Sequence, residues 1–183
     1  MVDAVELVRQ RLIRACAALE AGKVDYAVIG GNAVAAWVAT VDKAAVRNTQ
    51  DVDILIRRAD LPAAKAALEA VGFVHRRAAG LDLFLDDANV NPRHAVHLAF
   101  ADEVVKPGEP AANPGVKEST DFGSLRVINL EALARIKLTA FRDKDRTHLR
   151  DMIDVGLINT TWTAKLPPVL AARLQTLLDT PDG

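Results

Sequence analysis

Hydrophobic residues recur along the chain with two spacings, and each spacing predicts one kind of element. Recurrence every three or four positions is typical of an amphipathic helix, whereas alternation or a short apolar run is typical of a strand. We expect helices at residues 3–21, 32–40, 60–71, 130–141, 144–157 and 164–178. We expect strands at residues 25–29, 51–56, 73–77, 81–85, 94–100 and 125–128. Strands and helices therefore mix through the chain, which predicts an α/β fold.

The chain is long enough for one hydrophobic core with a small helical addition. It has 183 residues, half of them hydrophobic, so we expect a single domain over residues 1–183. Residues 24–128 carry the strands and form its core, and residues 129–183 form a C-terminal helical lobe. The segment 106–118 is rich in Pro and Gly and is predicted to be a surface loop.

Two adjacent glycines interrupt the apolar pattern near the first strand. The strand ending at Ile29 is followed by Gly30, Gly31 and Asn32, and an apolar helix follows them. Backbone amides at the start of a helix can bind a phosphate, and glycines let a ligand approach closely. The same sequence is also compatible with an ordinary tight turn.

Two acidic residues begin the next strand. Asp51 and Asp53 are two positions apart, so they project from one face, roughly 6.5 Å apart at about 3.3 Å per residue. Neighbouring ionised carboxylates repel each other, and a divalent cation or basic partners relieve that repulsion. On spacing alone, a solvated turn remains the alternative to a metal site.

Together these features resemble the signature of the nucleotidyltransferase superfamily, in the branch of the AbiEii-type toxins of bacterial toxin-antitoxin systems. The motif comprises Gly30-Gly31, a helix, and Arg47-x-Thr49-x-Asp51-x-Asp53 followed by Ile-Leu-Ile. The usual superfamily loop has Gly-Ser, whereas this chain has Gly-Gly. The gap of about twenty residues between glycines and acids also suits the AbiEii-type branch. The resemblance extends from about residue 25 to residue 158.

The resemblance implies a nucleotidyltransferase-like mixed sheet flanked by helices, and a role for each motif. Asp51 and Asp53 would hold Mg²⁺ or Mn²⁺, and the Gly30, Gly31 and Asn32 amides would hold phosphates of an NTP. Arg47, Thr49 and Lys137 would complete the nucleotide site, with Lys137 and Arg47 neutralising phosphate charge. Arg47 has a simpler alternative, which is an ion pair with Asp51.

His97 is where the chain departs from the superfamily pattern. A third acid is expected on a later strand beside the Asp-x-Asp pair, and the matching position in residues 94–100 is His97. An imidazole can act as a base near pH 7, but it brings no negative charge to a magnesium site. Three explanations follow: His97 is a general base, Asp82 or Asp102 supplies the carboxylate, or the site is weak. His97 could also be a purely structural histidine of the sheet.

The most basic part of the chain lies at residues 135–150. Such a charge run is usually a solvated helix face with local ion pairs. It also resembles the second conserved block of the AbiEii-like branch, in which Lys137 would reach the nucleotide phosphates and Asp151 would orient Lys137 or Arg142.

Composition limits the partners and the location. The net charge is −1 and the isoelectric point is about 6.4, so contact with nucleic acid would need a local basic patch. The single cysteine, Cys16, fits a reducing compartment. No secretory signal or membrane-length apolar run is evident, and we expect a cytoplasmic protein without membrane contact.

The leading hypothesis is an enzyme that transfers an NMP group from an NTP to a hydroxyl of an acceptor. By resemblance the acceptor is an RNA such as tRNA, a protein or a small molecule, and a toxin would have a cognate antitoxin. One alternative is a catalytically inactive relative that binds a nucleotide or a protein. Another is an α/β interaction domain whose Asp-x-Asp only caps a turn.

Overall fold

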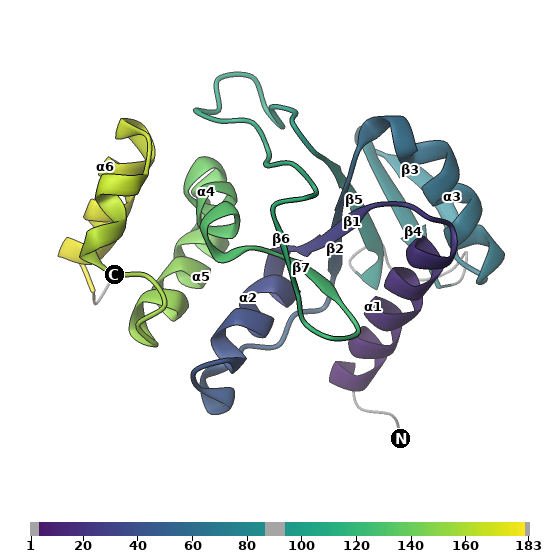
Figure 1. Cartoon of the computed structure of the whole chain (residues 1–183), viewed down its shortest axis with the longest axis horizontal. Coiled ribbons are helices and arrows are strands. Elements are labelled where there is room, and N and C mark those ends of the chain that lie inside the picture. The colour runs from purple at the N-terminus through teal and green to yellow at the C-terminus, as the bar shows by residue number, and fades with distance from the viewer. Residues whose placement is uncertain (1–3, 87–93, 182–183) are drawn as a thin grey trace.

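The computed structural model describes residues 4–86 and 94–181, and its centre is one mixed β-sheet (Figure 1). The strands are β1 Tyr26–Ile29, β2 Val52–Ile56, β3 Val74–Ala78, β4 Leu81–Leu85, β5 Val96–Phe100, β6 Ser119–Asp121 and β7 Arg126–Ile128. The α-helices are α1 Ala4–Ala21, α2 Gly30–Ala39, α3 Leu61–Ala70, α4 Leu130–Ala140, α5 Asp143–Asp154 and α6 Pro168–Asp179. Short 3-10 helices lie at Lys43–Ala45, Arg58–Asp60 and Thr160–Lys165.

The seven strands lie in the order β3-β4-β5-β2-β1-β7-β6. β2 runs antiparallel to β1 and parallel to β5, and β1 runs parallel to β7. α1 and α3 pack together beside β3 and β4, whereas α4, α5 and α6 gather at the opposite side of the molecule (Figure 1). α2 lies between the sheet and this C-terminal helical group, because it contacts β1, β2, α4 and α5. The predicted α/β fold with a mixed sheet flanked by helices is confirmed.

Burial explains why β1 and β2 can fix the position of polar groups. All four residues of β1 are buried, and in β2 only Asp53 is partly exposed. Apolar residues of α1, α2, α4 and α6 join these strands in one continuous core. The first polar groups at the ends of the two strands are therefore attached to a fully packed part of the fold.

Several boundaries differ from the sequence-based expectation. α2 begins at Gly30, two residues early, so both glycines belong to its first turn. The strand β6 was not expected, because Ser119–Asp121 is polar and forms a strand only by pairing with β7. Asp60 lies at the expected start of α3, but its carboxylate accepts a hydrogen bond from Arg57 Nε rather than capping the helix. Asp87, expected in a turn after β4, lies outside the described residues.

None of the helices within the described ranges combines the length and the apolar character that crossing a bilayer requires.

Candidate active site

The two sequence motifs meet at the junction of β1 and α2. The antiparallel pairing of β1 with β2 places Ile29 opposite Asp53. The chain then turns at Gly30, whose φ is +68°, and a Cβ atom there would lie 2.0 Å from Asp53 Oδ2. A Cβ atom on Gly31 would lie 2.8 Å from Thr49 Oγ1. A side chain at Gly30 would collide with Asp53 and one at Gly31 with Thr49, which explains the glycine at each position.

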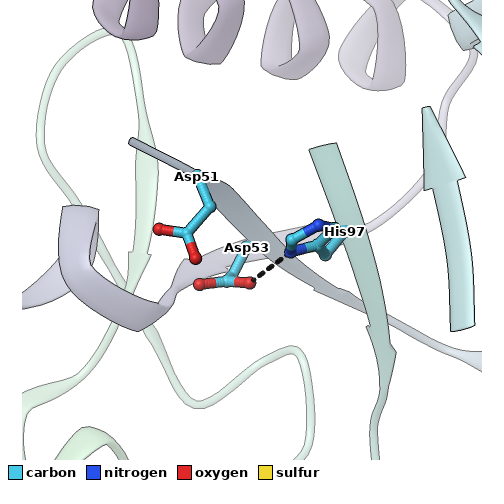
Figure 2. Close-up of side chains that lie close together, drawn as sticks. All are labelled: Asp51, Asp53 and His97. Carbon is cyan, nitrogen blue, oxygen red and sulfur yellow. Dashed lines mark hydrogen bonds and ion pairs between the residues drawn. The ribbon is translucent and has the colours of Figure 1, made fainter. Parts of the chain in front are cut away.

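Asp51, Asp53 and His97 form a cluster of possible metal ligands. One ligand atom from each lies within 4.8 Å of the others, and all three residues are partly buried. The parallel pairing of β2 with β5 sets Asp53 beside His97, and His97 Nδ1 lies 3.3 Å from Asp53 Oδ1. Figure 2 shows both carboxylates on one side of the strand, with the imidazole reaching them from the neighbouring strand.

The two other acids considered as a third carboxylate lie elsewhere. In the pairing of β4 with β5, Asp82 is opposite Leu98 and Leu83 is opposite His97, so Asp82 projects from the other face of the sheet. Its buried carboxylate lies 2.9 Å from His75 Nε2. Asp102 follows the far end of β5, five positions from His97, or roughly 16 Å along an extended chain. The explanation that Asp82 or Asp102 supplies the missing carboxylate is therefore wrong.

Asp51 has three fixed contacts. Thr49 Oγ1 donates to its Oδ1 at 2.6 Å, and Lys144 Nζ lies 3.4 Å from its Oδ2. Asn32 Nδ2 donates to its backbone carbonyl at 2.8 Å, which ties the start of β2 to α2. Burial pushes the pKa of Asp51 upward, but the Thr49 hydrogen bond and the Lys144 charge outweigh it and hold the pKa below its usual range. The Asp51 carboxylate is therefore ionised at neutral pH.

Arg47 does not pair with Asp51. Its Nε donates to both oxygens of Asp151, at 2.9 and 2.8 Å, and links the segment before β2 to α5. The simpler alternative for Arg47, an ion pair with Asp51, is thus wrong, because the observed partner is Asp151. The expected partners of Asp151, which were Lys137 and Arg142, are wrong as well.

Lys137 forms a buried ion pair with Asp145. Its Nζ is 3.1 Å from Asp145 Oδ1, and only 5% of Lys137 and 1% of Asp145 are exposed. Arg142 donates to the other oxygen of Asp145 through Nε at 2.8 Å. Burial raises the pKa of Asp145, but these two cations more than offset it and keep the pKa below the ordinary value. The residue that reaches the acidic pair is instead Lys144.

A cavity of about 590 Å³ opens beside the cluster, which is within the usual range for a small-molecule site. Its polar lining residues, together with Gly31, are Arg47, Asn48, Thr49, Gln50, Asp51, His97, Lys144, His148 and Asp151. Its apolar lining residues are Val34, Ala35, Val38 and Ala45, and Ala78, Ala79, Leu81 and Leu83 of the β3–β4 hairpin. Gly30, Asp53 and Lys137 are not among its lining residues.

α5 contributes a polar stripe to this cavity that was not predicted from the sequence. Lys144, His148 and Asp151 all line it, and their spacing of four and three positions places them on one helix face. Burial and the nearby Lys137 and Lys144 charges lower the pKa of His148 to about 4, so its imidazole is neutral at pH 7. His148 Nδ1 is buried and accepts or donates no hydrogen bond among the described residues.

Comparisons with known proteins identify the fold. No family model matches the chain, and no curated protein matches it significantly. The solution structure of the antibiotic-resistance factor ANT(2'')-Ia is similar over 96% of this chain and 91% of that one, with 14% identity and a TM-score of 0.55. A proposed nucleotidyltransferase from H. pylori is similar over 100% of this chain and 80% of that one, with 13% identity and a TM-score of 0.54.

These similarities establish a nucleotidyltransferase-like fold. Identities of 13% and 14% carry the likeness no further than the fold. The AbiEii-type branch is not distinguished from the rest of the superfamily by either structure.

Proposed function

We propose that this protein is a metal-dependent nucleotidyltransferase that moves an NMP group from an NTP to a hydroxyl of an acceptor. The observation that carries the proposal is the contact between the Gly30-Gly31 corner and the acidic strand. A helix start that binds phosphate and two carboxylates that bind a metal ion would act together by contacting the same metal–nucleotide complex. The strongest support is that a Cβ atom on Gly30 would lie 2.0 Å from Asp53 Oδ2, which explains why a glycine is required there.

The residues present fit a hard divalent cation. Asp51 and Asp53 offer carboxylate oxygens, which Mg²⁺ and Mn²⁺ prefer, and His97 offers a nitrogen that Mn²⁺ tolerates better than Mg²⁺. Such an ion, when bound, neutralises charge on the reacting phosphate and orients it. The chain's own task is to hold the carboxylates ionised and correctly oriented, which Thr49 does for Asp51.

The start of α2 would hold the departing phosphates. The amides of Gly30, Gly31 and Asn32 have no partner within the helix, because the first turn of any helix leaves its amides free. The Asn32 side chain is committed to the Asp51 carbonyl, so its contribution to a phosphate would come from its backbone amide. Lys144 and Arg47 are the two cations on the cavity wall in the described part of the chain.

The order of the strands indicates where the acceptor would approach. Nucleotidyl transfer forms a bond between the acceptor oxygen and the α-phosphorus while the bond to the bridging oxygen of pyrophosphate breaks, with the two oxygens in line. The phosphate corner lies on β1 and the acids on β2, so the attacking oxygen would come from the side of β5 and β4. His97 lies on that side, within 3.3 Å of Asp53, and is suited to accept the acceptor's proton.

The apolar hairpin would then face the acceptor. Ala78, Ala79, Leu81 and Leu83 form that wall of the cavity. The acceptor class is open between RNA such as tRNA, a protein and a small molecule. A toxin role with a cognate antitoxin is an extension of the same chemistry. ANT(2'')-Ia is an antibiotic-resistance factor, which makes a small-molecule acceptor one of the classes to test first.

Transfer of label from NTPs tests the proposal. The protein is incubated with each α-labelled NTP, with Mg²⁺ or Mn²⁺, and with separate RNA, protein and small-molecule fractions. Wild type is compared with Asp51→Asn and with the control Asp25→Asn, which changes an exposed acid whose ion-pair partner is Arg57, at 3.6 Å. Label transfer that is lost in Asp51→Asn and kept in Asp25→Asn supports the enzyme.

A second candidate function rests on the composition of the cluster. Among residues 4–86 and 94–181 the only group of three or more possible metal ligands contains two acids and one histidine. A nucleotide-binding protein without transfer activity would need no third carboxylate. Tight binding of an NTP by wild type, with no label transferred to any fraction, would favour this candidate.

A further inference from the structure

Lys144 occupies a position that helix energetics do not explain. It is the second residue of α5, and the positive end of the helix dipole disfavours a cation there. Its side chain is 58% exposed, and its ion-pair partner is Asp51, which comes from a distant part of the chain. Both the helix dipole and the loss of side-chain conformational freedom disfavour a lysine held in this position. The negative charge of Asp51 is the best explanation for it.

The contacts of Asp51 divide its two oxygens between different partners. Thr49 occupies Oδ1 through a hydrogen bond of 2.6 Å, and Lys144 occupies Oδ2 at 3.4 Å. Oδ2 accepts no hydrogen bond from Thr49, so a metal ion that binds there would compete with the ammonium group of Lys144. A divalent cation at Oδ2 would repel Lys144 strongly at such short range.

The other cations near the site are already paired with acids other than Asp51. Arg47 is held by both oxygens of Asp151, at 2.9 and 2.8 Å. Lys137 is 5% exposed and paired with Asp145. Lys144 has a flexible four-carbon stem and three donors, and it lines the same cavity as Gly31 and Thr49.

We propose that Lys144 is a positioning residue that exchanges partners during ligand binding. In the structure it neutralises Asp51. When a divalent ion takes Oδ2, Lys144 moves to a phosphate oxygen of the NTP that arrives with the ion. Metal and nucleotide then bind cooperatively, since the displaced ammonium gains a new anion only when the nucleotide is present. This inference rests on the proposed function, because it assumes that Asp51 and Asp53 bind a metal–nucleotide complex.

The test measures Mn²⁺ binding with and without nucleotide. Mn²⁺ affinity is measured by electron paramagnetic resonance for wild type, Lys144→Met and Lys65→Met. Affinity for Mn²⁺ with a non-hydrolysable ATP analogue is measured by calorimetry. Lys65→Met is the matched control, because Lys65 is also an exposed helical lysine, 3.9 Å from a carboxylate of Glu69.

The proposal predicts opposite effects of one substitution. Lys144→Met binds Mn²⁺ alone about three- to tenfold more tightly, because a competing cation is gone, and binds the Mn²⁺–nucleotide complex about tenfold more weakly. Lys65→Met matches wild type in both. Unchanged or weaker Mn²⁺ binding by Lys144→Met overturns the exchange.

The failure of the exchange can be told apart from the failure of the proposed function. If Mn²⁺ binds wild type and binding is lost in Asp51→Asn, the metal site stands whatever Lys144→Met shows. If wild type and Asp51→Asn bind Mn²⁺ equally, the metal site itself is absent, and the exchange falls with it.

Discussion

Gly30 and Asp53 are packed so closely that a single methyl group on Gly30 would lie 2.0 Å from a carboxylate oxygen of Asp53. The two residues are 23 positions apart in the chain (53 − 30), and the pairing of β1 with β2 brings them together. A glycine is therefore required at this position both by the left-handed backbone of the turn and by the closeness of Asp53 on the neighbouring strand. This contact suggests how to separate the role of the corner in stability from its role in binding.

Gly30→Ala should lose both stability and metal binding, whereas Gly72→Ala should lose only stability. Gly30 has φ +68° and Gly72 has φ +91°, so alanine is strained at both by about 1–3 kcal/mol. A Cβ atom on Gly72 meets nothing within 4 Å, but one on Gly30 displaces Asp53. Urea unfolding and Mn²⁺ titration measure the two effects. Equal Mn²⁺ affinity in the two variants would show that the displacement of Asp53 is unimportant.

Lys137→Met should destabilise the fold without changing Mn²⁺ affinity. The substitution leaves the buried Asp145 with Arg142 as its cation, and breaking such a pair costs about 3 kcal/mol. Lys137 does not line the cavity, so binding should persist in the folded fraction. Chemical unfolding and Mn²⁺ binding are measured on the same sample. Loss of NTP affinity at unchanged stability would instead assign Lys137 to the phosphates.

His148 should make the protein less stable in mild acid. Its pKa is lowered from 6.5 to about 4 in the folded state, so between these pH values the unfolded chain binds more protons than the folded one. Stability is therefore complete above pH 6.5 and falls as the pH drops toward 4, by about 2–3 kcal/mol between pH 7.5 and 4.5. Urea unfolding at both pH values should show this loss in wild type and a clearly smaller loss in His148→Gln. Equal losses in both proteins would mean that His148 is not the group responsible.

His97→Asp should increase the affinity for divalent ions. The substitution places a third carboxylate next to Asp53, which the present imidazole nitrogen approaches to 3.3 Å, and an added anionic oxygen suits Mg²⁺ better than a nitrogen does. We expect Mg²⁺ affinity to rise about tenfold, an effect of about 1.4 kcal/mol. His97→Asn serves as the uncharged control. A rise in label transfer with the rise in affinity would indicate that the natural site is limited by its missing carboxylate.

The sequence contained enough information to place the central strands and the acidic pair. β1 and β2 are apolar runs next to Gly30-Gly31 and Asp51-x-Asp53, and these local patterns persist in the structure because both strands are buried. The resemblance to the superfamily also implied that His97 lies on a strand beside Asp53, and the pairing of β2 with β5 agrees with it. Such inferences succeed when a period of two or an adjacent glycine pair determines the outcome.

The cationic side of the site could not be predicted in the same way. The partner of Arg47 is 104 positions away in the chain, and long-range ion pairs leave no local pattern. Lys137 and Lys144 both lie in a basic region, and only tertiary packing decides that one is buried and the other reaches Asp51. The spacing of Lys144, His148 and Asp151 was the available signal, but many solvated helix faces share it.

The central claim is that Asp51 and Asp53 jointly hold a divalent ion that brings a nucleotide to the start of α2. Calorimetric titration of Mn²⁺ with a non-hydrolysable NTP analogue tests it most directly, on wild type, Asp51→Asn, Asp53→Asn and the surface control Asp25→Asn. We expect wild type and Asp25→Asn to bind one metal–nucleotide complex with similar affinity, and each of the other two variants to bind at least about tenfold more weakly, since a metal ligand is lost. Equal affinity in all four proteins would contradict the account.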